Sequence, residues 1–203
     1  MSDLHDSQVT DEAPHLSLFH IACLVIAAGA LFFIVHVLNG WLLKAIEISD
    51  HISLLYLPAF LRLMNVLVLG MLWGTLGTAF GGMLLFFWFN DSLLLSCFNT
   101  AMSAGGAALA VWWMQILQGR ALSLARLSDL LQLSLLYALL NSFLHHLMWS
   151  FLDPAQLMSS SQIFFMILGD LNGAVLGALV LRWFARNTQL VNMAREKAKN
   201  SPS

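Results

Sequence analysis

The sequence has few charged residues and few cysteines. Asp, Glu, Lys and Arg together make up 10% of its 203 residues, against about a quarter in ordinary soluble domains. Its two cysteines, Cys23 and Cys97, stand far apart and belong to no CxxC motif. Both lie in apolar stretches, so we interpret them as packed side chains rather than as a disulfide or as metal ligands.

The familiar catalytic motifs are also missing. The sequence contains no HExxH, no GxSxG and no Walker loop, which are the arrangements that hold zinc, a serine nucleophile or a nucleotide phosphate. His145, His146 and Asp170 are residue types that zinc or iron accepts. Adjacent histidines, however, point about 100° apart on a helix. We therefore expect no enzyme activity, no cofactor and no metal.

What the chain has instead is apolar sequence. Hydrophobic residues make up 59% of it, and its mean hydropathy is +0.78. A soluble domain of this length does not need so much apolar sequence, so we predict an all-α, polytopic bundle of membrane-spanning helices. The lipid bilayer is then its first partner, and a net charge of −2 gives no reason to expect nucleic acid.

Hydropathy divides the chain into three parts, an acidic tail over 1–16, a transmembrane domain over 17–186 and a short basic tail over 187–203. A helix needs about 20 apolar residues to cross ~30 Å of hydrocarbon. About six stretches meet this need, and we expect helices over 17–39, 53–72, 75–90, 93–118, 129–149 and 162–184. The third is the shortest and follows a tight turn expected between Gly74 and Gly77. This leaves open a five-crossing alternative with one re-entrant hairpin.

Basic residues set the expected orientation. Lys and Arg collect on the cytoplasmic side of membrane proteins, and here they gather around Arg120 and Arg126 and near the C-terminus. Two crossings separate these regions, so both are expected on the cytoplasmic side, and six crossings place the N-terminus there too. Trp41, Trp88 and Trp149 then fall at the outer ends of helices, at the interface that tryptophan favours. The expected location is the bacterial inner membrane.

Two charged residues, Arg62 and Asp170, stand alone in apolar stretches of membrane-spanning length. A charge at the centre of the hydrocarbon costs at least about 2.5 kcal/mol, so it faces protein or water and finds a partner. Counted from the outer ends of their helices, both lie roughly 12–13 Å deep. They can therefore meet, and we predict that they form a buried pair at a polar centre.

Uncharged polar residues extend this centre. Tyr137, Asn141 and His145 recur every fourth residue and share one face of the fifth expected helix, and Asn65 lies one turn from the arginine. For these side chains the simpler interpretation is a network that holds the bundle together, at about 0.6 kcal/mol for each hydrogen bond. For the charged pair, binding of a ligand, ion or partner is an equally good interpretation, because a purely structural buried ion pair is often no better than apolar packing.

Glycines recur every fourth position around the second expected helix and again on the last one. Such spacing lets helix backbones approach closely, and in lipid this contact drives association. We predict a helix-packing role for Gly70, Gly74, Gly169, Gly173 and Gly177.

Two stretches resemble known membrane domains. Residues 56–82, YLPAFLRLMNVLVLGMLWGTLGTAFGG, are similar to the Pro-initiated helix, glycine turn and glycine-rich return helix of bacterial membrane-associated sensor domains of the MASE type. Residues 169–181, GDLNGAVLGALVL, are similar to their final Gly-Asp-x-x-Gly helix. The same pattern also resembles the six-helix substrate-binding subunits of energy-coupling-factor vitamin transporters. The resemblance implies a multihelix membrane module that receives a signal or small ligand and passes the change to another protein.

The expected function is therefore non-enzymatic. We predict a sensory, regulatory or accessory subunit that binds a small ligand or a membrane partner, either another membrane protein or a second copy of the chain. Its polar centre comprises Arg62, Asp170, Asn65, Tyr137, Asn141 and His145. The alternative is a small secondary transporter or proton-coupled carrier, in which Asp170 and His145 exchange protons during alternating access.

Overall fold

The structure is a computed structural model that describes residues 17–49, 52–89, 92–120, 122, 126–152 and 160–187. Most of the described residues belong to five helices, α1 Leu18–Leu42, α2 Pro58–Phe89, α3 Leu93–Gln118, α4 Leu127–Leu152 and α5 Ser160–Asn187. All five are long and apolar enough to cross a membrane. The prediction of a helical bundle with helices of membrane-spanning length and apolarity is confirmed, whereas six crossings and their orientation stay predictions. The predicted tail over 1–16, and the predicted C-terminal tail beyond residue 187, lie outside the described residues.

The ends of two helices follow from local sequence. Ser17 and Ser92 have extended backbones, and each side chain accepts a hydrogen bond from the backbone N–H three residues later, in α1 and α3. This is the usual way to satisfy the free N–H groups of a first turn. Gly119 ends α3 in the left-handed conformation, with φ 61° and ψ 19°, where glycine costs least.

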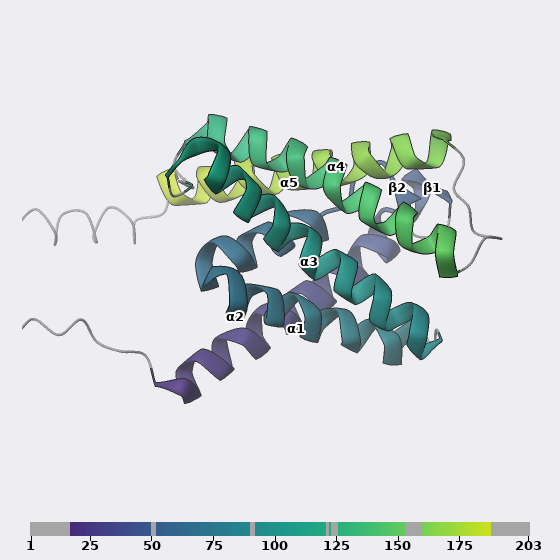
Figure 1. Cartoon of the computed structure of the whole chain (residues 1–203), viewed down its shortest axis with the longest axis horizontal. Coiled ribbons are helices and arrows are strands. Elements are labelled where there is room, and N and C mark those ends of the chain that lie inside the picture. The colour runs from purple at the N-terminus through teal and green to yellow at the C-terminus, as the bar shows by residue number, and fades with distance from the viewer. Residues whose placement is uncertain are drawn as a thin grey trace, which may run out of the picture.

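The helix α2 is broken at Gly70, where the chain reverses direction. Gly70 has φ 82° and ψ 170°, a region open almost only to glycine. The amide Nδ2 of Asn65 then donates to Thr78 Oγ1 at 3.1 Å, although thirteen residues of continuous helix would separate them by roughly 20 Å. Figure 1 shows the two arms of α2, 58–69 and 71–89, folding back on each other.

This break corrects two sequence predictions. The turn between the second and third expected helices lies at Gly70 rather than between Gly74 and Gly77. Gly70 also has no helix-packing role, because a Cβ there would meet nothing within 4 Å, whereas a Cβ on Gly74 would run into the backbone of Asn65 and Val66. Gly74 thus lets the arms of α2 approach each other, and Gly70 lets the chain turn.

The residues before α2 also differ from expectation. The helix predicted over 53–72 begins only at Pro58, in keeping with the bias that proline imposes against helix in the residue before it. Upstream, the strands β1 Glu47–Ser49 and β2 Ile52–Ser53 pair antiparallel. The chain between β2 and α2, residues 54–57, has no regular secondary structure. We call residues 53–57, which include the last residue of β2, the linker segment.

The linker segment is held by hydrogen bonds to α1 and α5. The backbone N–H of Tyr56 donates to the carbonyl oxygen of Gly169 at 3.0 Å. The backbone N–H of Leu57 donates to Asn39 Oδ1 at 2.8 Å, and Asn172 Nδ2 donates to the carbonyl of Leu54 at 2.9 Å. These three backbone groups are thereby paired without a helix.

Three predicted packing glycines of α5 make room for this contact. A Cβ on Gly169 would collide with the carbonyl oxygen of Ser53, one on Gly173 with that of Tyr56, and one on Gly177 with the ring of Phe60. Because glycine has no side chain, the linker segment and the first arm of α2 can lie directly on the α5 backbone. The glycine spacing of α5 therefore lets a segment without regular structure pack on the helix, in addition to another helix.

The long helices pack in sequence order, and α2 also packs on α5, which closes the bundle. In Figure 1 the start of α1 and the end of α5 lie at one end of the bundle, and β1 and β2 lie at the other. Phe87, Phe143 and Phe151 are largely exposed on the outside, where a bilayer would receive them. The apolar core gathers around Ala59, Leu63, Val66, Ala107, Val111, Leu133 and Tyr137.

Candidate ligand cavity and its buried polar cluster

A cavity of about 610 Å³ lies inside the bundle and is lined by residues of all five helices. Small-molecule sites usually measure about 300–1,000 Å³. At one end the lining includes Trp41 and Lys44 beside the end of α1, and Trp88 at the end of α2. At the other end it reaches Arg62 and Asp170 in the interior. The cavity thus runs from the β1–β2 end of the bundle to a buried polar cluster.

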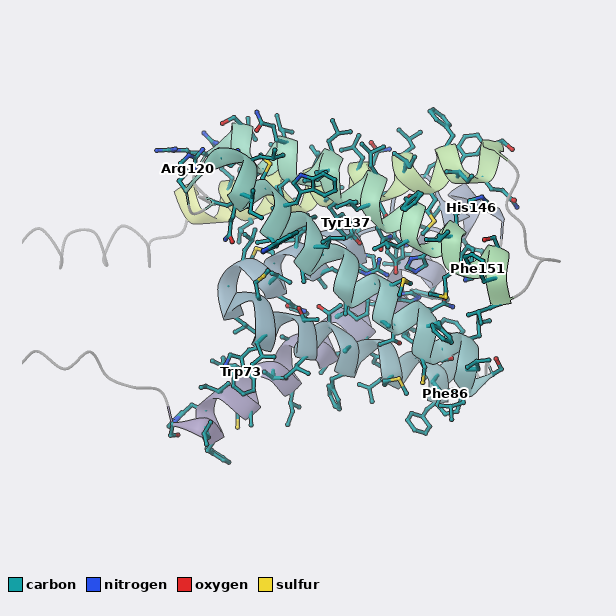
Figure 2. The ribbon with its side chains drawn as sticks, in the orientation of Figure 1. Trp73, Phe86, Arg120, Tyr137, His146 and Phe151 are labelled. Carbon is teal, nitrogen blue, oxygen red and sulfur yellow. The ribbon has the colours of Figure 1, made fainter. Side chains whose placement is uncertain are left out.

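Arg62, on the first arm of α2, is the centre of this cluster and is 5% exposed. Its Nη1 donates to Tyr137 Oη at 2.9 Å and to Asn141 Oδ1 at 3.5 Å, and its Nη2 donates to Tyr56 Oη at 2.8 Å. The guanidinium carbon lies 5.3 Å from the ring centre of Phe32 and 5.0 Å from that of Tyr56. Figure 2 shows Tyr137 in the middle of the bundle. The charge of Arg62 is therefore surrounded by neutral acceptors and aromatic rings.

Asp170, on α5, is 2% exposed and accepts one hydrogen bond from the part of the chain that the structure describes, from Asn141 Nδ2 to Oδ2 at 2.7 Å. The predicted Arg62–Asp170 pair is not a direct ion pair, because Asn141 lies between the two. Asn141 accepts from the arginine with Oδ1 and donates to the aspartate with Nδ2. The two charges share a network without touching, and the neutral amide connects them.

Two polar atoms of the charged side chains lack partners. Nε of Arg62 is fully buried and makes no hydrogen bond. Among the described residues, none donates to Oδ1 of Asp170, and Asp170 lines the cavity. A carboxylate offers about four acceptor positions, so Asp170 retains unused capacity on the side of the cavity.

His145 extends the network toward α3. Its Nδ1 lies 3.2 Å from the carbonyl oxygen of Asn141, and its Nε2 lies 3.3 Å from Ser103 Oγ. Because a carbonyl only accepts, Nδ1 carries a proton, and in the neutral form of the ring Nε2 accepts the serine proton. Ser96, Thr100 and Ser103 share one face of α3 and line the cavity. This face gives the cavity a row of hydroxyl groups.

A second branch of the network reaches α1 through Tyr56. Tyr56 Oη accepts from Arg62 and lies 2.8 Å from His36 Nδ1, so its own proton can go to the histidine. Asn39, three residues further on, holds the backbone of the linker segment. The linker segment therefore places a tyrosine between the buried arginine and the first helix.

The six residues predicted to form the polar centre do not all lie at the cavity. Arg62, Asn141, His145 and Asp170 line the cavity, and Tyr137 supports the arginine from behind. Asn65 stands apart, since it binds Thr78 and joins the two arms of α2.

Sequence reasoning missed several other members. The row of hydroxyls on α3 could have been found from its spacing of four and three residues, and His36 and Asn39 from their spacing of three. Tyr56 gave no such signal, because it lies outside any helix. No three His, Cys, Asp or Glu side chains in the described ranges gather closely enough to hold a metal ion.

Arg120 and Asp129 form a separate polar contact at the opposite end of the bundle, where Figure 2 labels Arg120. Both guanidinium Nη atoms donate to the carboxylate, each at 2.7 Å. The hydrogen bond to Asp129 raises the pKa of Arg120 above its ordinary value. This bidentate contact joins the end of α3 to the start of α4.

The fold and the cavity together define a helical bundle with five helices long and apolar enough to span a membrane and with a cavity that ends on buried charges. Comparisons of the chain with protein-family models, with curated proteins and with solved structures find no match.

Proposed function

We propose that the protein is a ligand-binding module of the bacterial inner membrane, and that it acts as a sensory, regulatory or accessory subunit. The observation that carries this proposal is the unused acceptor capacity of Asp170 at the inner end of a 610 Å³ cavity. A buried charge with an unfilled hydrogen bond is costly, and a ligand in the cavity can fill it. Intramembrane charges that face a cavity commonly mark ligand or ion sites.

We further propose that the chain crosses the membrane six times. The first arm of α2 has about 12 residues and spans only roughly 18 Å, so it needs the linker segment to complete a crossing. Irregular backbone is tolerated at membrane depth where it is buried in protein or lines a cavity. The paired backbone groups of Tyr56 and Leu57 meet this condition.

The cavity then opens to the outside of the cell. Its mouth carries Lys44, and the opposite end carries Arg120 and Arg126, the residues that the positive-inside rule assigns to the cytoplasm. Single cysteines test this in a background with Cys23→Ser and Cys97→Ser. A membrane-impermeant maleimide should label Lys44→Cys in intact cells and Arg126→Cys only after permeabilisation. The reverse pattern would refute the orientation.

Ligand binding is tested by purifying the protein from its native membrane in mild detergent and identifying retained small molecules by mass spectrometry. We expect a compound at fixed stoichiometry that is lost in the double variant Arg62→Leu/Asp170→Leu. A matched control is Thr78→Val, which removes a buried hydroxyl outside the cavity and should keep the compound. If neither the native preparation nor a screen of small molecules shows binding to the cavity, the proposal fails. The same preparation reveals whether a membrane protein partner co-purifies, as the subunit role requires.

A carrier is the second candidate, and the irregular linker segment favours it. Interrupted helices at a midplane site occur in many secondary transporters, and here the linker segment, which precedes the first arm of α2 without regular secondary structure, contributes Tyr56 to the shell of Arg62. Uptake of the retained compound into proteoliposomes, abolished by Asp170→Asn, would establish transport. Binding without uptake would leave the sensory or accessory role.

A further inference from the structure

We propose that the ligand is an uncharged, flat heteroaromatic compound whose ring N–H donates to Oδ1 of Asp170. The proposal rests on the ligand-binding function and names the chemical class that the cavity selects. Three features of the lining lead to it, namely the balance of charge, the missing hydrogen bond and the aromatic surface.

The charges at the inner end of the cavity already balance each other. Arg62 and Asp170 carry opposite charges and share one network through Asn141. A cationic ligand at Asp170 would also lie near the guanidinium, and an anionic ligand at Arg62 would also lie near the carboxylate. Either would leave one uncompensated charge in a buried site, which is strongly unfavourable. An uncharged ligand keeps the balance.

The carboxylate of Asp170 lacks a hydrogen-bond donor, whereas most of the N–H groups of Arg62 are paired or enclosed. Three of its five N–H groups donate to Tyr137, Asn141 and Tyr56, and its Nε is sealed from the cavity. The second N–H of Nη2 has no acceptor among the described residues, and it belongs to a guanidinium that lies beside the rings of Phe32 and Tyr56. Oδ1 of Asp170 is an acceptor to which no described residue donates, on a side chain that lines the cavity. The ligand must therefore bring an N–H or O–H group to the inner end.

The remaining lining suits a flat ring with polar edges. Aromatic side chains from α1, α2 and α4 line the cavity, namely Phe32, Trp41, Phe86, Trp88, Phe89 and Trp149. Aromatic rings pack well on such surfaces by offset or edge-to-face contacts. The hydroxyl row of Ser96, Thr100 and Ser103 can bind heteroatoms on the ring edge. A heteroaromatic ring with an N–H uses both surfaces, whereas an aliphatic chain uses neither the rings nor the hydroxyls fully.

The test uses four related probes on the purified full-length protein in lipid nanodiscs, with binding measured by calorimetry. Indole is uncharged and has a ring N–H, 1-methylindole lacks that N–H, tryptamine is a cation, and indole-3-acetate is an anion. We expect indole to bind at least about tenfold more tightly than 1-methylindole, which corresponds to the loss of one hydrogen bond. Neither charged probe should bind more tightly than indole. In Asp170→Asn the preference for indole over 1-methylindole should fall toward one, and in Thr78→Val it should persist.

The outcomes separate this inference from the broader function. Equal binding of indole and 1-methylindole, or tighter binding of a charged probe, would overturn the inference while cavity binding stands. If no probe binds but a compound co-purifies, its identity decides: an uncharged N–H heterocycle supports the inference, and any other compound refutes it. If nothing binds and nothing co-purifies, the ligand-binding function itself fails.

Discussion

Removing one charge of the buried network should cost more stability than the same change made after its partner has gone. Arg62→Leu leaves the carboxylate of Asp170 as an uncompensated charge beside Asn141. Asp170→Leu likewise leaves the guanidinium uncompensated. Deleting one partner of a buried charge pair costs about 3–5 kcal/mol, whereas replacing both by apolar residues is often neutral or stabilising.

The size of the effect follows from the contacts of the arginine. Two of its hydrogen bonds are short, at 2.9 Å to Tyr137 and 2.8 Å to Tyr56, and the third, to Asn141, is long at 3.5 Å. Each good bond contributes about 1 kcal/mol net. The double variant Arg62→Leu/Asp170→Leu should therefore lose about 2–3 kcal/mol of unfolding free energy. Each single variant should lose about 3 kcal/mol or more, so the double variant should be about 3 kcal/mol more stable than additivity predicts.

Reversible unfolding in mixed micelles measures this coupling between the two charges. It compares the unchanged protein, the two single variants and the double variant. Thr78→Val supplies the control, because its hydroxyl binds Asn65 and Gly74 rather than the charged network. Thr78→Val and Asp170→Leu should be additive within about 0.5 kcal/mol. Additivity of Arg62→Leu and Asp170→Leu would refute the idea that the two charges compensate each other through Asn141.

Two further predictions concern glycines and use matched sites within the chain. Gly70→Asn should lower the unfolding free energy by about 1–3 kcal/mol, because asparagine does not adopt the backbone conformation of Gly70. Gly119→Asn should change it little, because asparagine tolerates the left-handed region. Equal unfolding free energies for the two variants would contradict this. Gly173→Ala should lower the unfolding free energy by about 1–3 kcal/mol, because the added methyl group pushes the linker segment off α5. Gly105→Ala should be neutral or slightly stabilising, because a Cβ there meets nothing within 4 Å. Thermal unfolding in detergent measures both pairs, and equal melting temperatures for Gly173→Ala and Gly105→Ala would show that the contact is loose.

The helical architecture could be predicted because bilayer thickness and hydropathy constrain it strongly. Long apolar runs gave α1, α3, α4 and α5 close to their observed positions. Counting residues from the helix ends also placed Arg62 and Asp170 at a common depth, and they belong to one network. These predictions used only rise per residue and the cost of charge in hydrocarbon.

The linker segment could not be predicted in the same way. Leu54, Leu55 and Leu57 are as apolar as any helical stretch, and hydropathy records apolarity without backbone conformation. What replaces the helix here is tertiary, namely the bonds of Tyr56 to Gly169 and of Leu57 to Asn39. Such partners are distant in sequence and have no periodic signal.

The role of Asn141 in linking the two charges could also not be predicted from the sequence. A polar stripe on α4 indicated an inward face, but opposite charges at equal depth favoured a direct ion pair. The choice between direct and bridged contact depends on the relative position of the helices, which for α5 is set by close approach to the linker segment at Gly169 and Gly173. A difference of one side-chain length in the distance between the two helices decides between a direct and a bridged contact.

That difference bears directly on function. A direct Arg62–Asp170 pair would satisfy both charges and leave little for a ligand to do. With Asn141 between them, the arginine donates three hydrogen bonds to neutral groups, while Oδ1 of the aspartate has no donor among the described residues and faces the cavity. Tyr56 completes the shell of the arginine only because Gly173 lets the linker segment lie on α5. The packing glycines and the polar cluster therefore act together, because the close backbone approach at Gly173 brings Tyr56 to the arginine and the arginine does not need the aspartate as a direct partner. This leaves the aspartate free for the ligand that we propose.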